Sequence, residues 1–176
     1  MSRQGLIRLS IRPAELPATA LLARYRRADS YVDCFQCEFP APVTQAKFIE
    51  AFYTTWLFGI ERQLLGLIKR PSSDLQAQQL ASGQIDTFAA WRVEARTDTQ
   101  LLLADFSGQT RSWLMVEPIA NSGAQTRLYF GSAVVPRAAP DGQAQLGFAF
   151  KALLGFHKLY SRALLAAARR RLSRML

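Results

Sequence analysis

The sequence predicts an α+β protein in which a curved antiparallel sheet of five to seven strands grips a long C-terminal helix. Three observations support this prediction. A strand pattern near the start is followed by apolar residues at helical spacing, which indicate one or two inserted helices. Four more strand patterns follow, with turn residues between them. The chain then ends in an amphipathic helix over residues 146–176. This order is typical of helices packed on one face of an antiparallel sheet.

The first elements differ in how clearly the sequence specifies them. Residues 6–11 are compatible with a short strand, and residues 18–27 with a short helix. Residues 30–39 predict a strand more clearly, because their side chains alternate with a period of two. One face of this strand has Tyr31, Asp33, Phe35, Cys37 and Phe39. Pro40 and Pro42 end it.

Two helices are predicted after this strand. Thr44 is a suitable N-cap for the first, whose apolar stripe runs from Phe48 to Ile68. Pro71 ends that helix, because proline lacks the backbone N–H that the next turn needs. The second helix is shorter and covers residues 74–81, with a serine cap before it and Gly83 as its stop.

The second half of the chain predicts four antiparallel strands, over residues 88–96, 100–106, 110–117 and 126–135. Turn signals such as Ser107-Gly108 separate them, as expected in hairpins. A loop with proline and glycine leads into the last helix, which is rich in aromatic residues at its start and in arginine at its end.

The net charge of +9 comes almost entirely from the two ends of the chain. Residues 1–30 and 169–176 together contribute +8, whereas residues 31–168 are nearly neutral. Arginines also favour the carbonyl end of a helix for structural reasons. Aromatic residues do not interleave with lysine and arginine as they do on an RNA-binding sheet. We therefore expect no specific nucleic-acid partner.

Length and hydropathy predict one domain over residues 28–176, preceded by an N-terminal extension over residues 1–27. No apolar run approaches the roughly 18 residues that a transmembrane helix needs. The apolar cluster near the N-terminus is interrupted by Pro17 and Thr19 and makes a poor secretory signal. The expected location is the cytoplasm.

Four segments carry a family resemblance. They are ADSYVDCF at residues 28–35, the helix at residues 56–67, the strands at residues 101–116, and LGFHKLY at residues 154–160. Over about residues 28–172 the chain resembles a group of uncharacterised bacterial domains near the START-like (SRPBCC) superfamily. That group is expected to have a proline where this chain has Gly155. The resemblance implies a helix-grip fold, with two helices inserted after the first strand, and implies no catalytic residue.

The two cysteines, Cys34 and Cys37, form a C-x-x-C motif within an alternating strand, so their thiols are expected on opposite faces. Redox motifs of this kind stand at a helix N-terminus instead. A zinc site needs about four ligands, and the chain has two cysteines and one histidine. The cysteines are interpreted as structural, and no metal or cofactor is expected.

His157 and Asp33 are the first candidate site residues. His157 lies near the apolar stripe of the last helix, where it would act as an acid–base residue or as a hydrogen-bond donor to a ligand, or would have a structural role, bonded to a backbone carbonyl or to a carboxylate such as Asp33. Asp33 shares a strand face with aromatic side chains, so its carboxylate needs a partner or a wet cavity. The two residues are candidates to pair with each other.

Arg111 and Trp113 share one face of their strand, and Ser112 and Leu114 share the other. If the first face is concave, it offers an aromatic pocket with a charge, and Trp91 on a neighbouring strand extends it. If that face is convex, these residues form an ordinary surface. Periodicity alone leaves both alternatives open.

The leading hypothesis is a binding domain without catalysis, which holds a small apolar or amphipathic molecule between the sheet and the C-terminal helix. His157, Asp33 and Arg111 would orient the ligand, and Trp91 and Trp113 would provide aromatic walls. One alternative is an enzyme of the cyclase or hydratase type, as among some START-like proteins, with His157 as acid–base residue. Another is an interaction protein whose basic termini bind anionic lipid or nucleic acid.

Overall fold

The computed structural model describes residues 10–27, 30–58, 73–120, 124–135 and 148–176, with the backbone alone for residues 148–157. Within these ranges seven strands form one antiparallel sheet in the order β1-β2-β7-β6-β5-β4-β3. They are β1 (Arg12–Pro13), β2 (Tyr31–Phe39), β3 (Thr87–Phe88), β4 (Trp91–Arg96), β5 (Gln100–Asp105), β6 (Thr110–Pro118) and β7 (Thr126–Val134). The first long strand, β2, pairs along its whole length with the last, β7. The strands predicted from residue 30 onwards agree with the observed ones to within one or two residues, except that the segment predicted from Phe88 is divided between β3 and β4. Of the short strand predicted over residues 6–11, residues 6–9 lie outside the described residues, and residues 10 and 11 are not in a strand, since β1 begins at Arg12.

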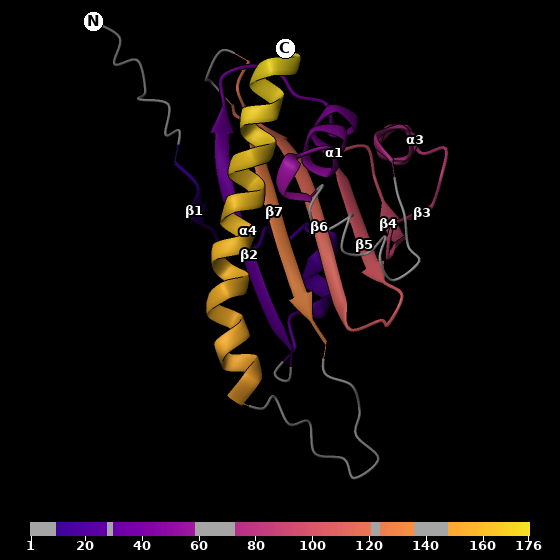
Figure 1. Cartoon of the computed structure of the whole chain (residues 1–176). Coiled ribbons are helices and arrows are strands. Elements are labelled where there is room, and N and C mark those ends of the chain that lie inside the picture. Colours follow the sequence, from indigo (N-terminus) through magenta and orange to yellow (C-terminus); the bar gives the residue numbers. More distant parts are fainter. Residues whose placement is uncertain (1–9, 28–29, 59–72, 121–123, 136–147) are drawn as a thin grey trace, which may run out of the picture.

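The described helices are η1 (Leu21–Tyr25, a 3-10 helix), α1 (Gln45–Tyr53), α3 (Asp74–Ser82) and α4 (Phe148–Met175). Helix α4 packs along β2 and β7, and α1 and α3 lie on the same face of the sheet (Figure 1). The α+β class, the antiparallel sheet and the C-terminal helix are therefore confirmed.

The helix ends follow the capping rules. The Thr44 hydroxyl accepts a hydrogen bond from the Lys47 amide at 3.3 Å, as predicted for an N-cap. Ser73 and Gln76 form a capping box at the start of α3. Gly83 ends α3 in the left-handed conformation, at φ +78°, which glycine adopts without a steric penalty.

The first predicted helix is not continuous. Helix α1 ends at Tyr53, and residues 56–58 are helical again after a break. At the break the Thr54 hydroxyl donates to the Glu50 carbonyl at 2.7 Å, and the Thr55 hydroxyl donates to the Phe52 carbonyl at 3.0 Å. These side-chain bonds compete with the backbone ladder of the helix. The rest of the predicted helix, from residue 59, lies outside the described residues.

Both faces of the sheet are buried. Phe35, Leu114 and Phe130 belong to the core beneath the helices. Trp113, Met115 and other residues of the opposite face belong to a second core, which residues 14–25 of the N-terminal segment cover. An antiparallel sheet usually leaves one face to water, whereas this sheet has an apolar cover on each side.

The N-terminal segment lies very close to the sheet. Leu22 is fully buried, and a Cβ on Gly131 of β7 would lie 2.9 Å from its Cδ2 atom. The side chain of Gln100 joins the layers: its Oε1 accepts from the Leu21 amide at 2.8 Å and from Trp113 Nε1 at 2.9 Å. Its Nε2 donates to the Thr19 carbonyl at 3.1 Å. This segment is thus packed as a layer of the structure.

We predict that Leu22→Ala lowers the free energy of unfolding by about 2–4 kcal/mol, because it leaves a cavity between the N-terminal segment and the sheet. Leu75→Ala is the matched control, since Leu75 lies on α3 and is 62% exposed. The control is expected to change stability by less than about 0.5 kcal/mol. Urea titration of both variants measures the difference. Equal effects would contradict the packing of the N-terminal segment as a core layer.

Candidate functional site

A cavity of about 330 Å³ lies between the helix-covered face of the sheet and the helices α1 and α4. Aromatic rings and one leucine form its apolar wall: Phe52, Phe58, Trp91, Phe130, Tyr160 and Leu164. The rings of Phe52 and Phe130 pack together, with centroids 4.8 Å apart. Walls of this kind suit an apolar ligand, because they exclude water while keeping a fixed shape.

The polar part of the wall comes from β5, β6 and β7, and most of it has partners inside the protein. The Asp105 carboxylate accepts from the Thr110 amide at 2.9 Å and from the Ser107 hydroxyl. The Ser112 hydroxyl lies 3.4 Å from that of Tyr53. These groups therefore already take part in hydrogen bonds within the protein.

Trp91 and Ser161 also border the cavity, and each has a buried polar atom without a hydrogen-bond partner among the described residues. The atoms are the indole Nε1 of Trp91 and the Oγ of Ser161, whose residue is 1% exposed. A buried donor left unpaired costs about 1–3 kcal/mol. Unpaired buried donors in a cavity wall are what a ligand with an acceptor would relieve.

Asp33 lies beside this cavity, opposite Ser132 in the register of β2 and β7. Its Oδ1 accepts from the Ser132 amide at 3.0 Å and from the Ser132 hydroxyl at 2.6 Å. Its Oδ2 accepts from the Tyr31 hydroxyl at 3.2 Å. Burial, together with the Asp33 carboxylate, raises the pKa of Tyr31, so that hydroxyl stays protonated and donating. Asp33 approaches the cavity through Ser132, which borders it.

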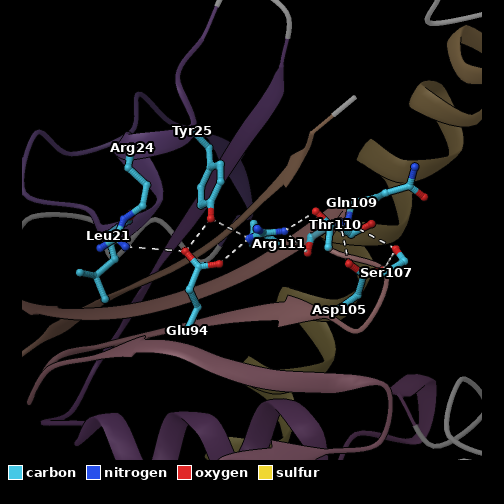
Figure 2. A network of polar contacts seen from close by, with 10 residues as sticks. Leu21, Arg24, Tyr25, Glu94, Asp105, Ser107, Gln109, Thr110 and Arg111 are labelled. Atoms are coloured by element: carbon cyan, nitrogen blue, oxygen red, sulfur yellow. Dashed lines mark hydrogen bonds and ion pairs between the residues drawn. The ribbon is translucent and has the colours of Figure 1, made fainter. Parts of the chain in front are cut away.

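Arg111 borders the cavity, yet its guanidinium is bound on the opposite face of the sheet (Figure 2). Arg111 Nε donates to Glu94 Oε2 at 2.6 Å and to the Tyr25 hydroxyl at 2.8 Å. The Tyr25 hydroxyl donates in turn to Glu94 Oε1 at 2.5 Å, and the guanidinium lies over the Tyr25 ring. The arginine thus fastens the N-terminal segment to the sheet.

A β-bulge places Glu94 in this network. The register between β4 and β5 shifts between Val93 and Ala95, so Glu94 is the extra residue. Before the bulge, Trp91 and Val93 pack on the helix-covered core, and after it Ala95 packs on the opposite core. The bulge explains how one strand contributes Trp91 to the cavity and Glu94 to the other face.

Trp113 lies on the face that the N-terminal segment covers, and it is fully buried there. The centroid of its ring is 6.0 Å from that of the phenol ring of Tyr129, which lies on the same face. The structure therefore brings Trp91 and Asp33 near the cavity and separates Trp113 from it. The side chain of His157 lies outside the described residues.

The two cysteines lie on opposite faces of β2, as predicted: Cys34 in the core under the N-terminal segment and Cys37 in the core under the helices. Burial raises the pKa of each thiol to about 12, and the Asp33 carboxylate adds to this effect at Cys34. Thiolate is the reactive form of cysteine. At neutral pH both thiols are consequently in the protonated, less reactive form.

Sequence reasoning missed Ser161, Gln100 and the Tyr25–Glu94 pair. Ser161 was detectable in principle, because a serine inside an apolar helical stripe needs a partner or a cavity. Nothing in the sequence placed Glu94 opposite Tyr25, since that contact joins residues far apart in the chain and depends on the bulge.

The described ranges contain neither a cluster of metal-ligating side chains nor a membrane-spanning helix. Over these residues no group of three or more His, Cys, Asp and Glu side chains is placed to hold a metal ion. In the same part of the chain, the helices are too short or too polar to cross a bilayer.

No protein-family model and no curated protein matches the chain. Among solved structures it is similar to the quaternary ammonium Rieske monooxygenase CntA in complex with the inhibitor MMV12, with 14% sequence identity and a TM-score of 0.35. The alignment covers 82% of this chain and 40% of that chain, so the protein spans less than half the length of the monooxygenase. A similarity this low carries no argument about activity.

The cysteines generate a prediction about pH. At pH 8 neither thiol of the folded protein should react with 5,5′-dithiobis(2-nitrobenzoate), because a pKa of about 12 leaves almost no thiolate. After unfolding in urea, both should react. Since burial raises the folded-state pKa above the unfolded value of about 8.5, the stability from the protonated thiols is complete below that value. It is lost as the pH rises towards 12. A thiol that reacts quickly in the folded protein at pH 8 would refute this prediction.

The network around Arg111 generates another prediction. Arg111→Met is expected to lower the free energy of unfolding by about 1.5–3 kcal/mol, because it removes charge-assisted hydrogen bonds to Glu94 and Tyr25. Arg92→Met is the matched control, since Arg92 is exposed on the same sheet. A double-mutant cycle with Tyr25→Phe measures the coupling between the segment and the strand. Additive effects of the two substitutions would show that the network does not fasten the N-terminal segment.

Proposed function

We propose that this protein is a binding domain for a small, neutral, largely apolar molecule with a hydrogen-bond acceptor. The ligand would lie in the cavity between the sheet and α4. The observation that carries this proposal is the presence of two unpaired buried donors, from Trp91 and Ser161, in the wall of a cavity that is lined in large part by aromatic rings. We infer that the fold is of the helix-grip type. The strand order and the helices between β2 and β3 support this inference.

The size of the cavity argues for a small ligand. Its volume of about 330 Å³ is at the lower end of the roughly 300–1,000 Å³ that is usual for small-molecule sites. The aromatic rings would supply most of the binding free energy through burial of apolar area.

The charge of the wall argues for a neutral ligand. The Asp105 carboxylate borders the cavity and disfavours an anion there. The guanidinium of Arg111, which would have favoured an anion, is bound to Glu94 on the opposite face. In the described part of the chain, no other cationic residue borders the cavity.

The two donors argue for an acceptor such as a carbonyl or ether oxygen. The indole N–H of Trp91 can only donate, and the hydroxyl of Ser161 can donate as well. Neither polar atom is in contact with solvent. Contact of the Ser161 hydroxyl with a ligand would require a different side-chain rotamer, and serine has three staggered rotamers about its first torsion.

The test uses Prodan, a neutral fluorescent naphthalene with one carbonyl acceptor. We expect one Prodan molecule to bind per chain with a blue shift of its emission, because the aromatic wall excludes water. Ser161→Ala and Trp91→Phe should each weaken binding by about five- to tenfold, the loss expected for one hydrogen bond.

Ser173→Ala is the matched control, because Ser173 is an exposed serine on the same helix. Its affinity for Prodan should equal that of the unsubstituted protein. Ser161→Leu should weaken binding more than Ser161→Ala does, because the larger side chain also takes up part of the cavity. If the Ser161→Leu variant folds and still binds Prodan with unchanged affinity, the cavity is not the binding site.

A further inference from the structure

A second groove, separate from the apolar cavity, lies between the end of α1 and the C-terminal half of α4. It has a volume of about 280 Å³. One wall is Thr54, Thr55 and Trp56, and the other is Ala167, Arg170, Arg171 and Arg174. The groove therefore joins one aromatic side chain to three guanidinium groups.

The three arginines have no ion pair within the described part of the chain. The ion pairs there use Glu38, Glu94 and Glu117. Arg169 differs from its neighbours, because its Nε donates to the Glu38 carbonyl at 3.4 Å. Arg170 and Arg174 are four residues apart on one helix, where like charges repel each other. A bound anion would relieve this repulsion.

Trp56 is the most exposed large apolar side chain of the described residues, at 72%. An indole combines an apolar ring with a polar N–H, and tryptophan is enriched where protein meets the interface of a membrane. An exposed tryptophan beside unpaired arginines is therefore a combination suited to an anionic lipid surface.

A nucleic-acid partner fits the groove less well. The hydroxyls of Thr54 and Thr55 already donate to backbone carbonyls, so they are not free to donate to a base edge. Proteins that hold single strands stack successive bases on several aromatic side chains. The described wall of this groove contains one, Trp56.

We propose that this groove is a docking site for the phosphate headgroups of anionic phospholipids. Arg170, Arg171 and Arg174 bind the phosphates, and Trp56 enters the interface beside them. The site is distinct from the apolar cavity, so the test of this proposal does not depend on whether the cavity binds the proposed ligand.

The experiment is sedimentation of the full chain with vesicles. The protein should bind vesicles of phosphatidylcholine and phosphatidylglycerol in equal parts, and should not bind phosphatidylcholine alone. The triple variant Arg170→Gln, Arg171→Gln, Arg174→Gln should bind roughly 100-fold more weakly, at about fivefold for each charge near the surface. Trp56→Ala should also weaken binding, and Ser161→Ala should leave it unchanged.

A charge-matched control removes Arg26, Arg27 and Arg92, which are exposed and lie elsewhere on the molecule. Its vesicle binding should stay within about threefold of the unsubstituted protein, because charges beyond about 10 Å are screened at moderate salt. An equal loss in both triple variants would mean that net charge alone attracts the vesicles, and would overturn the proposal. So would a single-stranded oligonucleotide that displaces the vesicles from the groove.

Fluorescence provides a readout that does not depend on the triple variant. The difference between the emission of the unsubstituted protein and that of Trp56→Phe reports on Trp56. On anionic vesicles this difference spectrum should shift to the blue, because the indole leaves water. An unshifted spectrum while vesicles are bound would overturn the proposed role of the groove.

Discussion

The burial of the sheet on both faces is the constraint on which the rest of this structure depends. Strands β5, β6 and β7 have runs of consecutive buried residues, such as Trp113, Leu114 and Met115, that cannot leave either face in water. The helices cover one face and the N-terminal segment covers the other. Because the segment has little regular structure of its own, side chains must fasten it. Gln100 and Arg111, reaching it from β5 and β6, do so by hydrogen bonds to its backbone and to Tyr25.

The same constraint explains what could be predicted from the sequence. Alternation and turn residues predicted the strands closely, because a strand's period is a local property. The choice between the two faces of β6 could not be predicted, since Trp113 and Leu114 are both apolar and both buried. The cover over Trp113 comes from a segment without strong periodicity. Its position follows from contacts such as that of Leu22 with Gly131, which join distant parts of the chain. The candidate site could accordingly be predicted only in part. Trp91 and Asp33 lie near the cavity, as expected, whereas Trp113 lies on the other face of the sheet.

The acids and arginines are distributed unevenly over the folded molecule. Glu38, Glu94 and Glu117 are each paired with arginines of the sheet or of the N-terminal segment. All of the ion pairs among the described residues use one of these three glutamates. The arginines at the end of α4 are left without described partners, although cations there also favour the helix carbonyl end. From the sequence alone, these arginines were interpreted as stabilising the carbonyl end of the helix. The exposed Trp56 lies beside them in the same groove, and this position is the reason for proposing an anionic ligand there.

Helix α4 connects the two pockets geometrically. Tyr160, Leu164, Ala167, Arg171 and Arg174 follow one another at helical spacing and form a single stripe beside the buried stripe of Leu165, Ala168 and Leu172. The first two line the apolar cavity, and the last three line the basic groove. Leu164 and Ala167 are about one turn apart, roughly 5 Å along the axis. The residues of α4 that line the apolar cavity and those that line the groove with the arginines therefore come within one turn of the helix of each other. The buried stripe holds both halves in a fixed relation to the sheet.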